Sequence, residues 1–267
     1  MYKYIDEKGE HLHTLNGKPL VGTSSVAGVL AKPLTWWSAG LAVEKFGWIN
    51  KKDEDGKFRT KEERLNNAIF KRDEIDNISN EEYLNLLDEA YSAHSKKLDS
   101  SAKAGTDLHF AIETYVKDCM KNGGKPNSLY NGLEHAKIQP FISWSCEKVK
   151  RFVWSEVNCY SERLYVGGIS DIGFEDAEGR TAVLDIKSSK EAYLSQFWQC
   201  IGYAIQLEEN GGLDKEGNLV FKLEKPIDYV VVFPFGMKTP EAQYYYDMEN
   251  GRKAFESECF LYKLMNN

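Results

Sequence analysis

Residues 166–203 of this 267-residue chain read VGGISDIGFEDAEGRTAVLDIKSSKEAYLSQFWQCIGY. The segment 165–174 mixes aromatic, β-branched and small residues, the segment 176–179 supplies turn formers, and the run 181–184 is apolar, which together predict a β-hairpin. Because side chains alternate between the two faces of a strand, Asp185 and Lys187 should point to one side while Ile186 turns into the core. In the right hairpin register, Asp171 joins them.

Two carboxylates and a lysine on neighbouring strands suggest a metal-dependent site that cleaves phosphodiesters. Mg²⁺ takes oxygen ligands at roughly 2.1 Å and accepts one or two protein carboxylates, which leaves positions for a substrate phosphate. Asp171 and Asp185 meet that requirement. A bound ion lowers the pKa of a water and neutralises charge on the phosphate, while Lys187 orients that water or stabilises the same charge.

Residues 191–208 predict a helix that follows the lysine. Phe197, Ile201 and Ile205 recur at helical spacing and form an apolar face suited to packing on a sheet. Gln199 and Tyr203 lie on a second stripe, where a glutamine and a phenol can hold a phosphate or the metal ligands by hydrogen bonds. The alternative is an ordinary polar margin of the helix.

Three segments, 168–171, 184–188 and 199–203, resemble the successive motifs of the PD-(D/E)XK nuclease superfamily, in its RecB-like branch with a Q-x-x-x-Y helix. Residues 104–113 (AGTDLHFAIE) resemble the G-T-x-x-H-x-x-x-E helix of the same branch. The resemblance covers about residues 103–235 and is strongest to phage-type and mitochondrial-genome-maintenance-type exonucleases. A D-x-K triplet alone is a weak signal, and the order of all four segments carries the resemblance.

The resemblance implies a site as well as a fold. His109, Asp171 and Asp185 would bind Mg²⁺ or Mn²⁺, the carbonyl of Ile186 would add a ligand, and Lys187 would act on the water. Gln199 and Tyr203 would position these groups.

The predicted elements agree with the α/β core of this superfamily, a central mixed sheet flanked by helices. They are helices at 103–122 and about 133–150, three strands within 152–187, the helix 191–208, a strand at 227–234 and a closing helix at 250–265.

Two glutamates are further candidates with open roles. Glu156 lies on the predicted strand 152–160 and is either a site residue or an exposed strand charge. Glu113 stands one helical turn beyond His109, where it either orients the histidine, as carboxylates around metal ligands do, or is simply solvated.

The first hundred residues differ in character from the rest, so we expect an N-terminal hairpin and helical region at 1–102 and a nuclease core at 103–267. Turn pairs at 8–9 and 16–17 predict a hairpin within residues 1–20, and a capping box at 79–82 predicts a helix to about residue 98. The charged run 51–64 is either a solvated segment or a clamp over a single strand, with Trp36 and Trp37 as stacking surfaces. Two adjacent tryptophans on a helix cannot face the same side, so at least one should be in the core.

Composition limits the alternatives. The net charge of −7 argues against a globally basic nucleic-acid binder, although Lys148, Lys150 and Arg151 form a local basic cluster that could contact phosphates. Five cysteines without a C-x-x-C pair indicate a reducing compartment. Some members of the branch that the chain resembles hold an iron–sulfur cluster with one upstream and three closely spaced downstream cysteines, but here only Cys259 lies beyond the core, so no such cluster is expected. The start of the chain lacks the apolar segment of a targeting signal, which predicts a cytoplasmic protein in a bacterial or phage-infected cell.

The sequence therefore predicts a Mg²⁺- or Mn²⁺-dependent deoxyribonuclease whose partner is DNA, with exonuclease action on single-stranded or frayed ends favoured. Two alternatives stay open: a non-catalytic nucleic-acid-binding accessory of the same fold, and an endonuclease of restriction type. The sequence does not indicate the polarity of digestion, the preference for DNA or RNA, or the oligomeric state.

Overall fold

A computed structural model describes residues 1–7, 10–29, 35–53 and 55–266 of the chain. The chain divides into two compact units, one made of residues 1–31 and 105–267 and the other of residues 32–104. The first 31 residues thus group with the core, which differs from the expected division after residue 102. The physical reason is a long-range strand pairing: β4 (Val21–Gly22) runs parallel to the strand at Val166–Gly167, and Thr23 Oγ1 donates a hydrogen bond to the Gly167 carbonyl at 3.0 Å.

The core unit is built on a mixed eight-stranded sheet with the order β11-β10-β7-β6-β5-β8-β9 and β4 beside β6. The β7–β10 and β4–β6 pairs are parallel, while β5, β6 and β7 form an antiparallel meander. These strands confirm the expected central mixed sheet. Their bounds are β5 Val149–Ser161, β6 Val166–Asp176, β7 Thr181–Lys187, β8 Gly212–Leu213, β9 Leu219–Phe221, β10 Tyr229–Pro234 and β11 Gln243–Tyr245.

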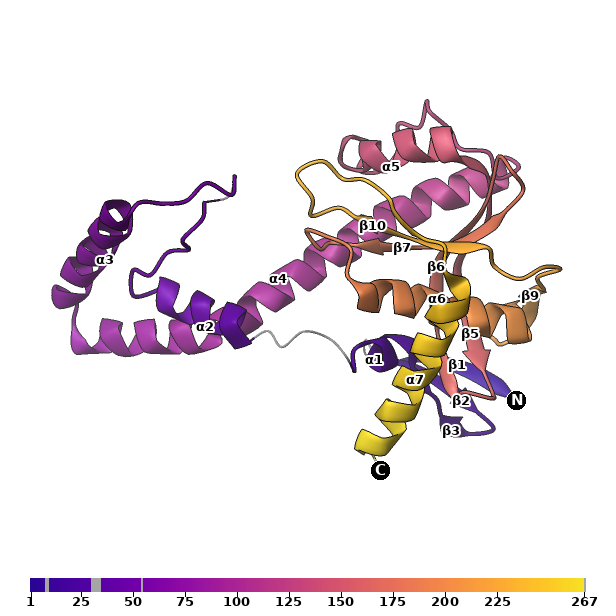
Figure 1. Cartoon of the computed structure of the whole chain (residues 1–267), viewed down its shortest axis with the longest axis horizontal. Coiled ribbons are helices and arrows are strands. Elements are labelled where there is room, and N and C mark those ends of the chain that lie inside the picture. The colour runs from indigo at the N-terminus through magenta and orange to yellow at the C-terminus, as the bar shows by residue number, and fades with distance from the viewer. Residues whose placement is uncertain (8–9, 30–34, 54, 267) are drawn as a thin grey trace. The chain divides into compact units, whose positions relative to one another are not determined.

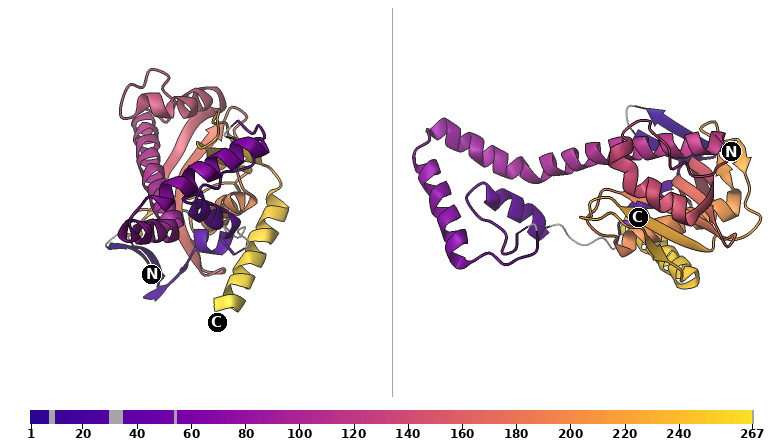
Figure 2. Two further views of the ribbon diagram at one scale, coloured as in Figure 1. Left: turned by 90° about the vertical axis from the view of Figure 1, so that its left-hand side faces the viewer. Right: turned by 90° about the horizontal axis from the view of Figure 1, so that it is seen from above.

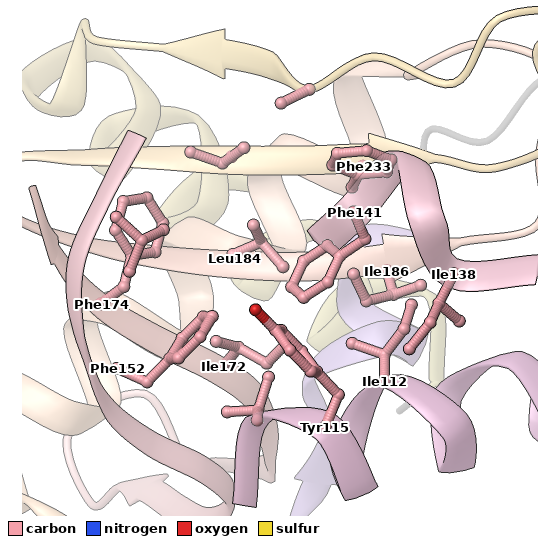
Figure 3. Packing of buried hydrophobic residues seen from close by; sticks show 14 of the residues in the cluster. Ile112, Tyr115, Ile138, Phe141, Phe152, Ile172, Phe174, Leu184, Ile186 and Phe233 are labelled. Carbon is pink, nitrogen blue, oxygen red and sulfur yellow. The ribbon is translucent and has the colours of Figure 1, made fainter. Parts of the chain in front are cut away.

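Helices cover both faces of this sheet (Figures 1 and 2). On one face, the C-terminal part of α4 (Asn80–Lys121) and α5 (His135–Lys148) bury a cluster that includes Tyr115, Phe141 and Leu184, shown in Figure 3. On the other face, α6 (Leu194–Asn210), α7 (Met248–Asn266) and the short α1 (Thr23–Ala27) bury a second cluster. The helices expected on either side of the sheet are therefore present.

Helix α4 is longer than the sequence predicts. It begins next to Ser79, whose backbone N–H donates to the Glu82 carboxylate at 2.8 Å while the Glu82 backbone N–H donates to Ser79 Oγ at 3.3 Å, as the capping box requires. The expected end near residue 98 is wrong. Residues 99–104 contain neither glycine nor proline, so the helix continues into the segment expected as a separate helix. Neither α4 nor any other helix of the described residues combines the length and the apolar composition needed to cross a membrane.

The N-terminal hairpin is confirmed. Strand β1 (Tyr2–Glu7) pairs antiparallel with β2 (Glu10–Leu15), and β3 (Lys18–Pro19) follows a turn in which Asn16 and Gly17 have φ of 52° and 78°. Two consecutive positive φ values are typical of a type I′ turn, which asparagine and glycine adopt most easily. The turn expected at 8–9 lies outside the described residues.

The second unit, residues 32–104, consists of α2 (Thr35–Glu44), α3 (Lys61–Asp76) and the first part of α4. Lys45 Nζ lies 2.7 Å from Glu89 Oε2 and ties the segment after α2 to α4. None of the described residues of α2 is buried. The expectation that one of the adjacent tryptophans belongs to the core is wrong, because Trp36 is 90% exposed and Trp37 is also exposed. This unit is too small to bury large side chains from every helix.

Candidate metal centre

The β6–β7 hairpin brings the two predicted aspartates together. Ile172 pairs with Leu184 across the hairpin, so the same antiparallel register sets Asp171 opposite Asp185. Ile186 is buried in the cluster under α4 and α5, while Lys187 Nζ lies 2.7 Å from Asp185 Oδ2. The alternation predicted for residues 185–187 is thus present, with the aspartate and the lysine on one side and the isoleucine on the other.

His109, on α4, lies at the end of β7. Its Nε2 donates to the carbonyl of Ile186 at 2.7 Å, and its Nδ1 is 3.4 Å from Asp171 Oδ2. That same carboxylate oxygen accepts the backbone N–H of Ile186 at 3.1 Å. The imidazole, the Asp171 carboxylate and the Ile186 carbonyl therefore converge on one place, and all three were expected ligands.

Glu156 completes the group because of an unusual backbone. Its φ is 51°, in the left-handed region that costs a residue other than glycine about 1–3 kcal/mol. Trp154 and Val157, three residues apart, both lie in the cluster under α6, although a regular strand would place them on opposite faces. Because the strand reverses its alternation here, the Glu156 carboxylate meets His109 and Asp171, with one donor atom from each residue within 4.8 Å of the others.

Burial and mutual repulsion disturb the charges of this group. Burial raises the pKa of Glu156 to about 8, with further contributions from the negative charges of Asp171 and Glu113. Burial likewise raises the pKa of Asp185, which is only 1% exposed, to about 6, although the Lys187 ammonium opposes the rise. A cation would relieve the cost of holding three carboxylates together out of water.

Lys187 carries the opposite charge. Burial lowers its pKa, but the carboxylates of Asp185 and Asp171 outweigh that effect and raise the pKa to about 12. The side chain is therefore an ammonium at any ordinary pH, able to donate hydrogen bonds to anionic oxygens but unable to accept a proton.

The donor set fits a divalent cation. Carboxylate and carbonyl oxygens suit hard ions such as Mg²⁺ and Mn²⁺, while an imidazole nitrogen suits transition ions, so the donor set by itself does not select one metal. Among the described residues, the side chains whose donor atoms lie close enough together to share one ion are those of His109, Glu156 and Asp171. Asp185, which was expected as a ligand, forms an ion pair with Lys187 instead.

Gln199 and Tyr203 form a hydrogen-bonded pair on α6, with Gln199 Nε2 donating to Tyr203 Oη at 2.7 Å. Burial first, and then the nearby charges of Asp185 and Asp171, raise the pKa of the Tyr203 phenol. A Cβ on Gly168 would lie only 2.7 Å from the Tyr203 ring. Glycine is therefore needed at 168 for the ring to pack against β6.

Two supporting residues, Thr23 and Gln206, were not among the candidates expected from the sequence. Thr23 Oγ1 accepts from Gln206 Nε2 at 2.8 Å and donates to the backbone of β6, fixing α6 against the sheet. Gln206 stands out as a buried amide within the apolar run 200–207, which is the one clue available. Thr23 lies 144 residues from its partner on β6, so no local pattern could identify it.

The remaining candidates have other partners. Glu113 forms an ion pair with Lys117 one helical turn away. The contacts of the His109 ring are with Ile186 and Asp171, so Glu113 does not orient the histidine. Each cation of the basic cluster 148–151 meets an acid: Lys148 pairs with Glu147, and both Lys150 and Arg151 pair with Glu175.

The described part of the charged run 51–64 is mostly exposed, with Asp53, Arg59 and Arg64 partly buried. Some of its residues contact one another. The Arg59 guanidinium donates to the carbonyls of Asn50 and Lys52, and Lys52 Nζ lies 4.9 Å over the Phe58 ring. All five cysteines are free thiols.

No protein-family model matches the chain, and no curated protein matches it at a significant level of similarity.

Proposed function

We propose that this protein is a metal-dependent deoxyribonuclease of the PD-(D/E)XK type. One observation supports the proposal most strongly: His109, Glu156 and Asp171 meet as potential ligands beside the buried Asp185–Lys187 ion pair. A purely structural cluster has no need for three carboxylates held close together, since each raises the cost of ionising the others.

In this proposal the ligands are the side chains of His109, Glu156 and Asp171 and the carbonyl of Ile186. Asp185 holds Lys187 and takes part as a ligand or through that ion pair. When bound, a divalent ion supplies an activated water and neutralises charge on the phosphate. Lys187 would donate to the phosphate or the water as an ammonium, since the neighbouring carboxylates raise its pKa to about 12. The Gln199–Tyr203 pair keeps the α6 side of the site in a fixed geometry.

We propose single-stranded or frayed DNA ends as the substrate. The exposed rings of Trp36 and Trp37, together with the cations of the run 51–64, support a strand-binding role for residues 32–104. Stacking of a base on an aromatic ring is tolerant of sequence and contributes about 1–3 kcal/mol per base.

The test is a digestion series with purified protein and Mn²⁺ or Mg²⁺. End-labelled single strands, duplexes with free or blocked ends, and closed circular DNA are incubated with wild type and with Lys187→Ala. We expect divalent-ion-dependent loss of strands with free ends and no cleavage by the variant. Intact substrates throughout, or equal cleavage by Lys187→Ala, would contradict the nuclease proposal. Cleavage of closed circles would replace the exonuclease by an endonuclease, and DNA binding without turnover would favour a binding accessory.

A further inference from the structure

A shallow groove runs along the outer side of α4, starting beside the metal centre. It has a volume of about 300 Å³ and is lined by Phe110, Glu113, Thr114, Lys117, Asp118, Lys121 and Tyr130. This volume lies at the lower end of the range for ligand pockets. From the first to the last helical residue the groove follows about 16 Å of helix, a shape that suits an extended strand better than a compact molecule.

The α4 residues of the groove form one stripe. Positions 110, 113, 114, 117, 118 and 121 recur every three or four residues, which places them on one side of the helix. The opposite side, with Ala111, Ile112 and Tyr115, is buried in the core. The stripe is therefore an outer surface held by a rigid, well-packed helix.

The stripe begins at the site. Phe110 directly follows His109 in the sequence, and its side chain is 56% exposed. An exposed aromatic ring beside a metal ligand has no packing role in the core. Glu113 and Lys117, the next members, are near enough to Glu156 for their charges to act on its carboxyl, so this end of the groove lies near the metal centre.

The groups along the groove match those of a polynucleotide strand. Phe110 offers a ring for stacking, Lys117 and Lys121 offer ammonium groups one helical turn apart, and Asp118 and Thr114 offer acceptors for base amino groups. Lys117 is paired with Glu113 and would exchange that partner for a phosphate, whereas Lys121 is exposed.

We propose that this groove binds the strand segment next to the scissile phosphate, with a base on Phe110 and the following phosphates at Lys117 and Lys121. The inference rests on the proposed nuclease function and names the surface that delivers the strand to the metal centre. It assigns a strand-binding role to three residues that lie outside the catalytic group: Phe110, Lys117 and Lys121.

The chain contains a matched control groove. On α7, Lys253, Glu256, Ser257, Phe260 and Leu261 line a groove that also presents an exposed phenylalanine, 63% exposed, beside a lysine. None of these residues belongs to the metal centre. Substitutions in the α7 groove also remove a phenylalanine ring or a lysine charge, but at a surface where we propose no DNA binding.

The test measures binding of a fluorescently labelled single-stranded oligonucleotide by anisotropy, with Ca²⁺ in place of Mn²⁺, at several salt concentrations. Phe110→Ala should weaken binding about 5-fold to about 160-fold without changing the salt dependence, and Phe110→Trp should restore it. Lys121→Ala should lower the slope of log affinity against log salt by about 0.7. Phe260→Ala and Lys253→Ala should leave both quantities unchanged, and melting curves verify that all variants fold.

Two results overturn this inference and leave the nuclease proposal standing. One is a wild type that binds and cleaves while Phe110→Ala and Lys121→Ala behave identically to it. The other is equal loss of affinity from the α7 variants. A wild type that neither binds nor cleaves DNA with any divalent ion overturns the proposed function, and the groove inference with it.

Discussion

Replacing Glu156 by glutamine should stabilise the metal-free protein while weakening its response to metal. The substitution keeps the shape of the side chain but removes the charge that burial and the neighbouring carboxylates oppose. In the folded protein the pKa of Glu156 is raised from 4.5 to about 8. A carboxyl with a raised folded pKa contributes its full stability below pH 4.5, and that contribution is lost as the pH rises to about 8.

The magnitude follows from the interval between these values. Each pH unit across the interval corresponds to about 1.4 kcal/mol. Relative to its value below pH 4.5, the unfolding free energy of the wild type is therefore lower by about 3 kcal/mol at pH 7 and by about 5 kcal/mol above pH 8. Relaxation of the group makes these figures upper limits. In Glu156→Gln the loss does not occur, so the difference in unfolding free energy between variant and wild type should grow from pH 4.5 to 8 and then level off.

The assay is urea denaturation in EDTA at a series of pH values, repeated with Mn²⁺. An ion that binds only the folded protein stabilises it by about 2.7 kcal/mol at one hundred times its dissociation constant. We expect this gain in the wild type and a smaller gain in Glu156→Gln. The reasoning is refuted if the variant is less stable than wild type at pH 8 without metal, or if Mn²⁺ stabilises the two proteins equally.

Three further substitutions test neighbouring parts of the structure. Lys187→Ala should abolish cleavage and destabilise the fold by about 3–5 kcal/mol, because it leaves Asp185 buried without its counter-charge; a denaturation curve unchanged from wild type would contradict this. Among the described residues, neither carboxylate oxygen of Glu258, which is 1% exposed, has a hydrogen-bond partner, and burial raises its pKa to about 7. The free energy of unfolding of the wild type should therefore fall by about 3 kcal/mol between pH 4.5 and 7, and that of Glu258→Gln should not. If the two unfolding free energies changed with pH in parallel, this prediction would be wrong. Tyr203→Phe removes the acceptor of the Gln199 amide, so we expect a lower kcat with little change in the melting temperature; unchanged turnover would show that the pair has no part in the reaction.

The parts of the fold that could be predicted from sequence are those governed by local periodicity. The alternation at 185–187 follows from the two-residue repeat of a strand, and the β6–β7 hairpin follows from its turn residues. Both features, the strand alternation and the hairpin turn, depend on residues that are only a few positions apart in the sequence. The meeting of Asp171 with Asp185 then requires only the hairpin register.

Glu156 and the N-terminal segment could not be predicted in the same way. A glutamate in the left-handed region is unfavourable locally, so its conformation depends on the packing of Trp154 and Val157 around it. The pairing of β4 with β6 involves two residues on each side and a separation of 145 positions, which leaves no pattern in either segment. The division of the chain and the reversal of β5 are both products of tertiary contacts.

The hydrogen bond from His109 Nε2 to the Ile186 carbonyl links α4 to the end of β7 without any ion. A divalent ion held by the same two atoms would replace the shared proton, so it would take over an existing link between helix and strand instead of creating a new one. The fold around the site is in this sense assembled before any metal would bind.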